Sequence, residues 1–113
     1  MSRRDPQVRL RHMLDAAREA RQLSGEVDRS HLEDNRVLTL ALIRLLEIVG
    51  EAARKIPSNE RPIHPDIPWQ AIIGLRHRLI HGYDQVDMEI LWQILNYDLG
   101  QLVEALEELL NSD

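Results

Sequence analysis

Apolar residues recur at three- and four-residue spacing along most of the chain, the pattern of amphipathic helices. The first such segment begins at Asp5-Pro6, an N-cap residue followed by proline at the first helical position, and ends at Ser24-Gly25. A second segment begins at Ser30–Glu33, which has the serine-to-glutamate spacing of a capping box. It continues to about Ile56 and is ended by Pro57. The first half of the chain is therefore predicted to form two long helices.

The second half predicts two further helices, after a connector over residues 57–68 that holds four prolines. The third helix begins near Trp69 and ends around Ile80, because residues 81–86 break the pattern. Asp87 then caps a fourth helix that runs to the C-terminus. Its apolar face is spaced almost as in a coiled coil and consists of Leu91, Leu95, Leu99, Leu102, Leu106 and Leu109.

These segments predict an all-α fold, an up-and-down four-helix bundle with short connectors, and no strand pattern competes. The 113 residues fit a single domain, 1–113, that can bury one core. Trp69 and Trp92 are expected to anchor that core rather than to stack on bases, and Tyr97 is expected to be structural.

The middle of the second helix, residues 37–49, is apolar on more than one face. Such a helix is either the centre of a bundle or faces both a core and a partner subunit. The stretch is too short and too polar to span a bilayer, so no membrane association is expected. A polar stripe shares this helix, and it is either a ladder of surface ion pairs or a polar wall beside an active site. Its members are Arg44, Glu47, Glu51 and Arg54.

The net charge of −5 argues at first against nucleic acid, which needs a positive surface. The charge is unevenly placed, however, because residues 1–61 hold 12 basic and 10 acidic side chains and residues 62–113 hold 2 and 9. The two basic residues of the acidic half, Arg76 and Arg78, lie together. The chain lacks cysteine, which excludes disulfides and thiolate metal sites. With no apolar signal segment at the start, a cytoplasmic location is expected.

The segment 76–83 holds the densest group of reactive side chains. Arg76 and His81 lie five residues apart across a predicted helix end, a spacing that can bring both to one opening. Arginine can bind a phosphate through two parallel hydrogen bonds, and histidine can transfer a proton near neutral pH. That pair suffices in principle to cleave RNA without a metal ion. A pair at this spacing also arises often by chance, with a purely structural role.

His77 and His81 have the i, i+4 spacing of two metal ligands on one helix. Arg78 stands between them in place of the glutamate of the zinc-protease motif, and a nearby cation disfavours a metal ion. No glycine-rich phosphate loop or serine elbow is present. The sequence therefore predicts neither a metal site nor a cofactor.

Arg76, His81 and Tyr83 have the spacing of the R-x4-H-x-Y motif and resemble that motif in the HepT family, whose members have a HEPN domain. Three segments of the chain resemble segments of the family, in the same order along the sequence. Residues 48–53 look like the family's I-G-E-A-A segment, residues 64–69 like its H-P-E-I-P-W connector, and residues 75–87 like its catalytic stretch up to the next helix cap. The likeness covers nearly the whole chain, and the order of the helices agrees with it.

The resemblance implies a helical bundle that forms a homodimer, with two motifs in a shared cleft. It implies an RNA-cleaving toxin of a type II toxin–antitoxin module, with Arg76 and His81 catalytic and His77 and Arg78 auxiliary. It further implies an MntA-like nucleotidyltransferase antitoxin that attaches AMP to Tyr83. Two copies of Arg76 and Arg78 would then face each other as a small basic cleft.

The leading hypothesis is therefore a metal-independent endoribonuclease that acts on tRNA or mRNA and leaves a 2′,3′-cyclic phosphate; DNA is not expected as a ligand. An alternative is a non-catalytic helical binding module, or a substrate partner of a nucleotidyltransferase, in which Tyr83 is the acceptor. A purely structural helical dimer is a third hypothesis.

Overall fold

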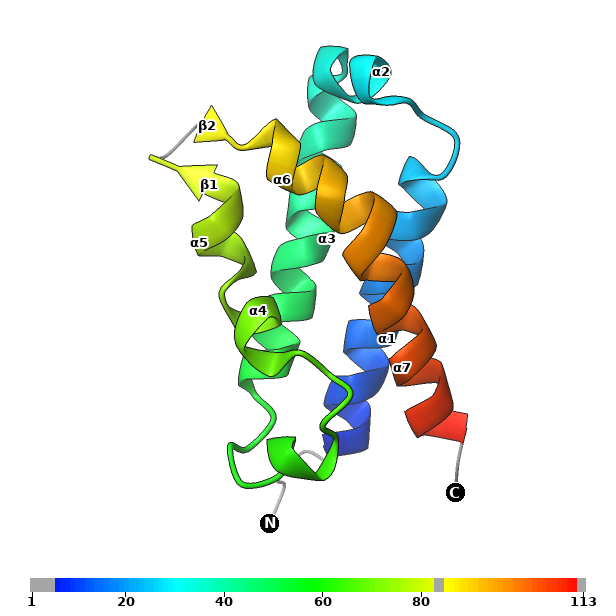
Figure 1. The fold of residues 1–113 in the computed structure, drawn as a ribbon, viewed down its shortest axis with the longest axis vertical. Coiled ribbons are helices and arrows are strands. Elements are labelled where there is room, and N and C mark those ends of the chain that lie inside the picture. Colours follow the sequence, from blue (N-terminus) through cyan, green and yellow to red (C-terminus); the bar gives the residue numbers. More distant parts are fainter. Residues whose placement is uncertain (1–5, 83–84, 112–113) are drawn as a thin grey trace.

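The computed structural model describes residues 6–82 and 85–111, and they form an all-α fold with one short hairpin. The long helices are α1 (Pro6–Ser24), α3 (Arg36–Arg54) and α7 (Leu99–Asn111), drawn in blue, green and red in Figure 1. The predicted all-α class is confirmed. Asp5, the predicted cap of the first helix, lies outside the described residues.

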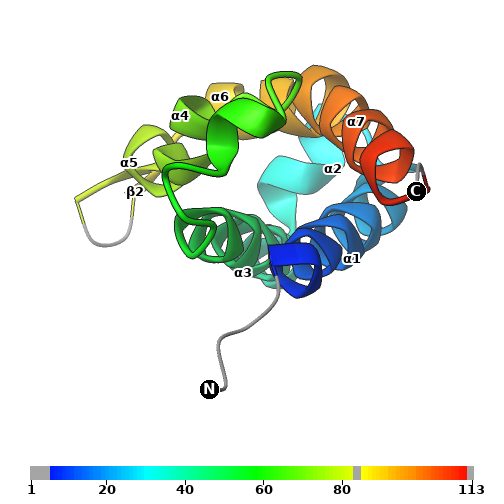
Figure 2. The same cartoon turned by 90° about the horizontal axis from the view of Figure 1, so that it is seen from below.

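Helix α1 lies between α3 and α7 and packs against both, as the end-on view shows (Figure 2). Its core face is rich in small side chains, because Ala16, Ala17 and Ala20 are all buried. The facing side of α3 buries larger residues, including Leu42, Leu46 and Val49. Small residues on one helix and large ones on the other allow the two helices to approach closely. The α1–α3 pair is therefore the centre of the core.

The predicted second helix is interrupted at Asn35. A short helix, α2 (Arg29–Asp34), precedes α3, and Asn35 between them has an extended backbone. The Asn35 side chain accepts a hydrogen bond from the N–H of Leu38 at 2.9 Å and so caps α3. The buried Thr39 hydroxyl donates to the carbonyl of Leu32 at 3.0 Å, which ties the two helices together.

The expected capping box at Ser30 is wrong. The N-cap of α2 is Asp28, whose carboxylate accepts from the N–H of His31 at 2.8 Å. Ser30 already lies inside the helix. Aspartate caps a helix as well as serine does, and it stands two positions earlier. The first helical residue is therefore Arg29, two positions before the one that a cap at Ser30 would give.

The predicted third helix divides into α4 (Trp69–Ile73) and α5 (Leu75–Leu79), with Gly74 between them. A 3-10 turn, η1 (Arg61–Ile63), lies in the proline-rich connector before α4. Trp69 is half-buried against the core, and its indole N–H donates to the carbonyls of Arg61 and His64 at 2.9 and 3.2 Å. The predicted anchoring role of Trp69 is confirmed, and its polar end fixes the connector.

Two short strands follow α5, and the sequence pattern missed them. Strand β1 (Ile80–His81) pairs antiparallel with β2 (Gln85–Val86), so that Ile80 faces Val86 and His81 faces Gln85. Gly82 has a φ of 77°, a left-handed conformation that favours glycine. Strands of two residues are too short to produce an alternating pattern, which explains why only the break was predictable.

The last predicted helix has three parts: α6 (Met88–Gln93), a π-helical turn η2 (Ile94–Asp98), and α7. Its predicted cap is confirmed, because the Asp87 carboxylate accepts from the N–H of Ile90 at 3.1 Å. Trp92 is half-buried against the core, as expected. Tyr97 is 67% exposed and takes no part in the core, contrary to expectation.

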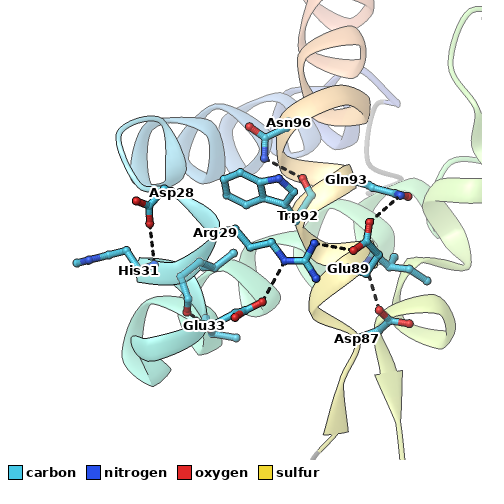
Figure 3. Close-up of polar contacts among 12 residues, drawn as sticks. Asp28, Arg29, His31, Glu33, Asp87, Glu89, Trp92, Gln93 and Asn96 are labelled. Carbon is cyan, nitrogen blue, oxygen red and sulfur yellow. Dashed lines mark hydrogen bonds and ion pairs between the residues drawn. The ribbon is translucent and has the colours of Figure 1, made fainter.

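An ion-pair cluster fastens α2 to α6, as the close-up shows (Figure 3). The Arg29 guanidinium donates to Glu89 at 2.6 Å and to Glu33 at 3.0 Å. The hydrogen bond to Glu89, and then that to Glu33, raise the pKa of Arg29 above its ordinary value. This cluster holds the start of α6, and with it Asp87, at a fixed place beside α2. None of the described helices is long and apolar enough to cross a membrane.

Gly50 marks a close approach of α3 to α4. A Cβ at this position would lie 3.0 Å from the carbonyl oxygen of Ile72. We therefore expect Gly50→Ala to lower the free energy of unfolding by about 1–3 kcal/mol, because α4 must move away. Gly100→Ala is the matched control, since its Cβ would only meet the Arg21 side chain at 3.8 Å. Urea unfolding measures both variants, and equal stabilities would contradict the close packing.

Candidate active site

The predicted site residues lie at the junction of α5 and β1. Arg76, His77 and Arg78 belong to α5, and His81 is the last residue of β1. Leu75 and Leu79 of α5 are buried, so the residues between them are carried on a helix that is anchored at both ends. Tyr83, the predicted modified residue, lies outside the described residues.

Arg76 is bound by a carboxylate of α3. Its guanidinium Nη1 donates to Oε2 of Glu47, whose side chain is only 18% exposed. The other carboxylate oxygen, Oε1, accepts from Arg44 at 3.4 Å, and Arg44 also lies 3.6 Å from Glu51. The polar stripe is therefore an ion-pair ladder, as one prediction had it, and the ladder reaches the motif arginine. The carbonyl oxygen of Arg54, the last residue of the polar stripe, accepts a hydrogen bond from the Arg61 guanidinium at 3.2 Å.

His81 is held by a different carboxylate. Its Nε2 lies 3.3 Å from Oδ2 of Asp87, the residue whose other oxygen caps α6. The N–H of Asp87 donates to the carbonyl of Leu79 at 2.8 Å, so the hairpin brings Asp87 back to the start of β1. The hydrogen bond from Ile90 lowers the pKa of Asp87 below its ordinary value, and His81 adds to this effect. Asp87 is thus an anion placed beside the motif histidine.

Arg76 and His81 are not joined to each other. Within residues 6–82 and 85–111, neither a hydrogen bond nor an ion pair links the two side chains. Neighbouring residues of a strand point to opposite faces, so His81 points away from the face that carries Ile80. Ile80 lines a cavity together with Arg76. In the single chain, Arg76 and His81 are thus held by two different carboxylates.

The two auxiliary residues are also separated. His77 is exposed on α5. Arg78 is half-buried and lines a different cavity of about 540 Å³, which Asp98 of η2 and Leu102 of α7 also line. Arg76 and Arg78 thus line different cavities of the single chain, because residues two apart on a helix do not share a face.

Sequence reasoning did not single out two carboxylates of the site. Glu47 was recognised only as part of a stripe, and Asp87 only as a helix cap. Their ion pairs are tertiary contacts across 29 and 6 residues, which no local spacing reveals. Within the described part of the chain, no group of three or more histidine, aspartate or glutamate side chains is arranged to hold a metal ion.

Comparisons with known proteins give one consistent family. Residues 13–109 match the family model described as Ribonuclease HepT-like. A Methanocaldococcus jannaschii protein named as a putative RNase is 35% identical over 107 residues, 95% of this chain and 98% of that protein. A Thermococcus cleftensis protein named as a probable ribonuclease HepT is 42% identical over 69 residues, 61% of this chain and 63% of its own length. No solved structure matches significantly.

The lowered pKa of Asp87 makes stability depend on pH. The stabilising effect of this carboxylate is complete above the ordinary aspartate value of 3.8 and is lost as the pH falls below it. Asp87→Asn retains a good helix cap but does not titrate. We expect the melting temperature of the wild type to fall more steeply below about pH 4 than that of Asp87→Asn. Thermal unfolding followed by circular dichroism tests this, and parallel curves would contradict it.

Proposed function

Because the chain belongs to the HepT-like ribonuclease family, we propose that it is a metal-independent endoribonuclease that acts through Arg76 and His81. The observation that carries the proposal is the arrangement of these two side chains. Both are more than half exposed, and each has one carboxylate partner. An exposed arginine and histidine with acidic partners fit a site for phosphate and proton transfer.

The proposed reaction is an internal transesterification. The ribose 2′-oxygen attacks the neighbouring phosphorus as the bond to the 5′-oxygen breaks, leaving a 2′,3′-cyclic phosphate and a 5′-hydroxyl. His81 takes the proton from the 2′-hydroxyl or gives one to the 5′-oxygen, water carries the other proton, and Arg76 stabilises the charge on the phosphorane. Asp87 and Glu47 act as positioning residues, because their oxygens restrict the rotamers of His81 and Arg76.

We further propose that two copies assemble to complete the site. Membership of the family supports this, because the R-x4-H motif implies two motifs in a shared cleft. Val37 is 79% exposed and Leu40 is 48% exposed, so α3 carries an apolar surface beside the motif. A helix that is apolar on more than one face can meet a partner subunit as well as the core. The expected assembly is a two-fold symmetric dimer.

The family membership also supports a role as a toxin of a toxin–antitoxin module, which is neutralised by a nucleotidyltransferase that attaches AMP to Tyr83. Tyr83 follows His81 by two residues, so a nucleotide on its hydroxyl would stand beside the proton-transfer group. The added phosphodiester would repel the RNA backbone, and the nucleoside would occupy its place.

A non-catalytic binding module is the second candidate. The observation that favours it is that Arg76 is already neutralised by Glu47 in the single chain. In this case the motif would bind the phosphates of an incoming nucleotide, and Tyr83 would be the acceptor.

We expect His81→Ala to lose RNA cleavage by at least about 100-fold, because general acid–base catalysis contributes that much. Cleavage of a labelled RNA is measured with excess chelator, with His12→Ala as the matched control that should remain active, because His12 is exposed on α1. Light scattering on all three proteins checks that each is the same dimer, and a monomeric mass would contradict the proposed assembly. Persistent cleavage by His81→Ala, or dependence on a divalent metal ion, would rule out the mechanism.

The proposed modification is tested by co-expression with a nucleotidyltransferase encoded beside this chain. Intact-protein mass spectrometry should show steps of one AMP unit in the wild type and none in Tyr83→Phe. Tyr97→Phe is the matched control, since Tyr97 is an exposed tyrosine on another element, η2. Mass steps that persist in Tyr83→Phe would place the modification elsewhere, and an unmodified wild type would remove this form of regulation.

A further inference from the structure

A cavity of about 450 Å³ lies between α3 and the hairpin. Its size is within the range of small-molecule and cofactor sites. Three arginines, Arg36, Arg44 and Arg76, line it together with two glutamates, Glu33 and Glu47. Because Arg76 is the motif arginine, this cavity is continuous with the candidate active site.

One wall of the cavity is aliphatic. Ile80 and Val86 face each other across the hairpin and both line the cavity, as does Met88 at the start of α6. On the other side, Leu40 and Ile43 of α3 line it. The paired apolar residues of the β-hairpin therefore form a surface on which a flat, partly apolar group can lie.

The arginines have a regular spacing on α3. Arg36, Leu40 and Arg44 are four residues apart, so they share one face of the helix. A helix rises about 1.5 Å per residue, which places Arg36 and Arg44 about 12 Å apart along its axis. The two arginines therefore lie along the α3 side of the cavity.

The two acidic residues of the cavity are already engaged. Glu33 accepts from Arg29 at 3.0 Å, and Glu47 accepts from both Arg76 and Arg44. Among the residues that the structure describes, the Arg36 guanidinium has no hydrogen-bond or ion-pair partner. An unpaired guanidinium at a cavity rim is suited to bind an anion from solution.

We propose that this cavity binds the RNA strand next to the scissile phosphate, with Arg36 and Arg44 on backbone phosphates and a nucleoside against the aliphatic wall. The inference rests on the proposed function for the identity of the ligand as RNA. Phosphate contacts made by a few arginines give local, salt-dependent binding, which suits a protein with a net charge of −5. An acidic protein segment is the competing ligand, and continuity with Arg76 favours RNA over it.

The test is the binding of a short fluorescent 2′-O-methyl RNA, which has no free 2′-hydroxyl and so cannot be cleaved. Fluorescence anisotropy gives the dissociation constant over a range of sodium chloride concentrations. Each phosphate contact on a single strand contributes about 0.7 to the slope of log K against log salt. Arg36→Gln removes an unpartnered guanidinium, so it should fold normally. We expect it to lower the slope by about that amount and to weaken binding at low salt several-fold.

Arg44→Gln should show the same loss of slope, and Arg11→Gln is the matched control. Arg11 is exposed on α1, and the cavity that it lines lies beside the end of α7. An unchanged slope in Arg36→Gln and Arg44→Gln would overturn the proposal. An equal loss in Arg11→Gln would overturn it too, because the effect would then reflect overall charge. Loss of the dimer in Arg36→Gln, or tighter binding of a poly-glutamate peptide than of RNA, would assign this surface to a protein partner instead.

The binding assay separates this inference from the proposed nuclease activity. If the wild type binds the oligonucleotide with the expected dependence on Arg36 but does not cleave normal RNA, the cavity stands and the nuclease proposal fails. The wild type could instead cleave RNA while Arg36→Gln binds the oligonucleotide as tightly as the wild type and has the same KM. That result would support the proposed nuclease activity and contradict the proposed RNA-binding cavity. A rise in KM with kcat unchanged is the kinetic result expected of a binding residue.

Discussion

The burial of α3 against its neighbours is the interaction on which the rest of the molecule depends. One face of this helix packs on the alanine-rich side of α1, and another meets α4 so closely that a Cβ at Gly50 would lie 3.0 Å from the carbonyl oxygen of Ile72. The α5 helix also packs on α3, and α5 carries the motif arginine. A polar stripe on the same helix supplies Glu47 to that arginine. The helix that organises the core thus also organises the candidate site.

The hairpin between α5 and α6 has a similar double role. Asp87 closes it through its backbone N–H, begins α6 with one carboxylate oxygen and contacts His81 with the other. The Arg29 cluster then fixes α6 against α2. The place of His81 is therefore set by the folding of the chain on both sides of it, and not by the motif alone.

The sequence predicted the helical class, the ends of the first helix and the cap at Asp87, because each depends on residues close together in the chain. It did not predict the interruptions. Asn35 ends one helix and caps the next, a role that a continuous apolar pattern hides. The contact of Arg76 with Glu47 spans 29 residues and depends on how α5 packs against α3. The motif itself was identifiable, but the two carboxylates that hold its arginine and its histidine required the three-dimensional structure.

The ion pair between Glu47 and Arg76 has a consequence for selectivity. Any anion that seeks this arginine competes with a tethered carboxylate, which is present at a high effective concentration. A small monovalent anion gains one contact and loses that competition. A chain of phosphates gains contacts at several arginines at once and can displace the glutamate. The pairing with Glu47 therefore makes Arg76 a weaker site for a single anion than for a chain of phosphates that contacts several arginines.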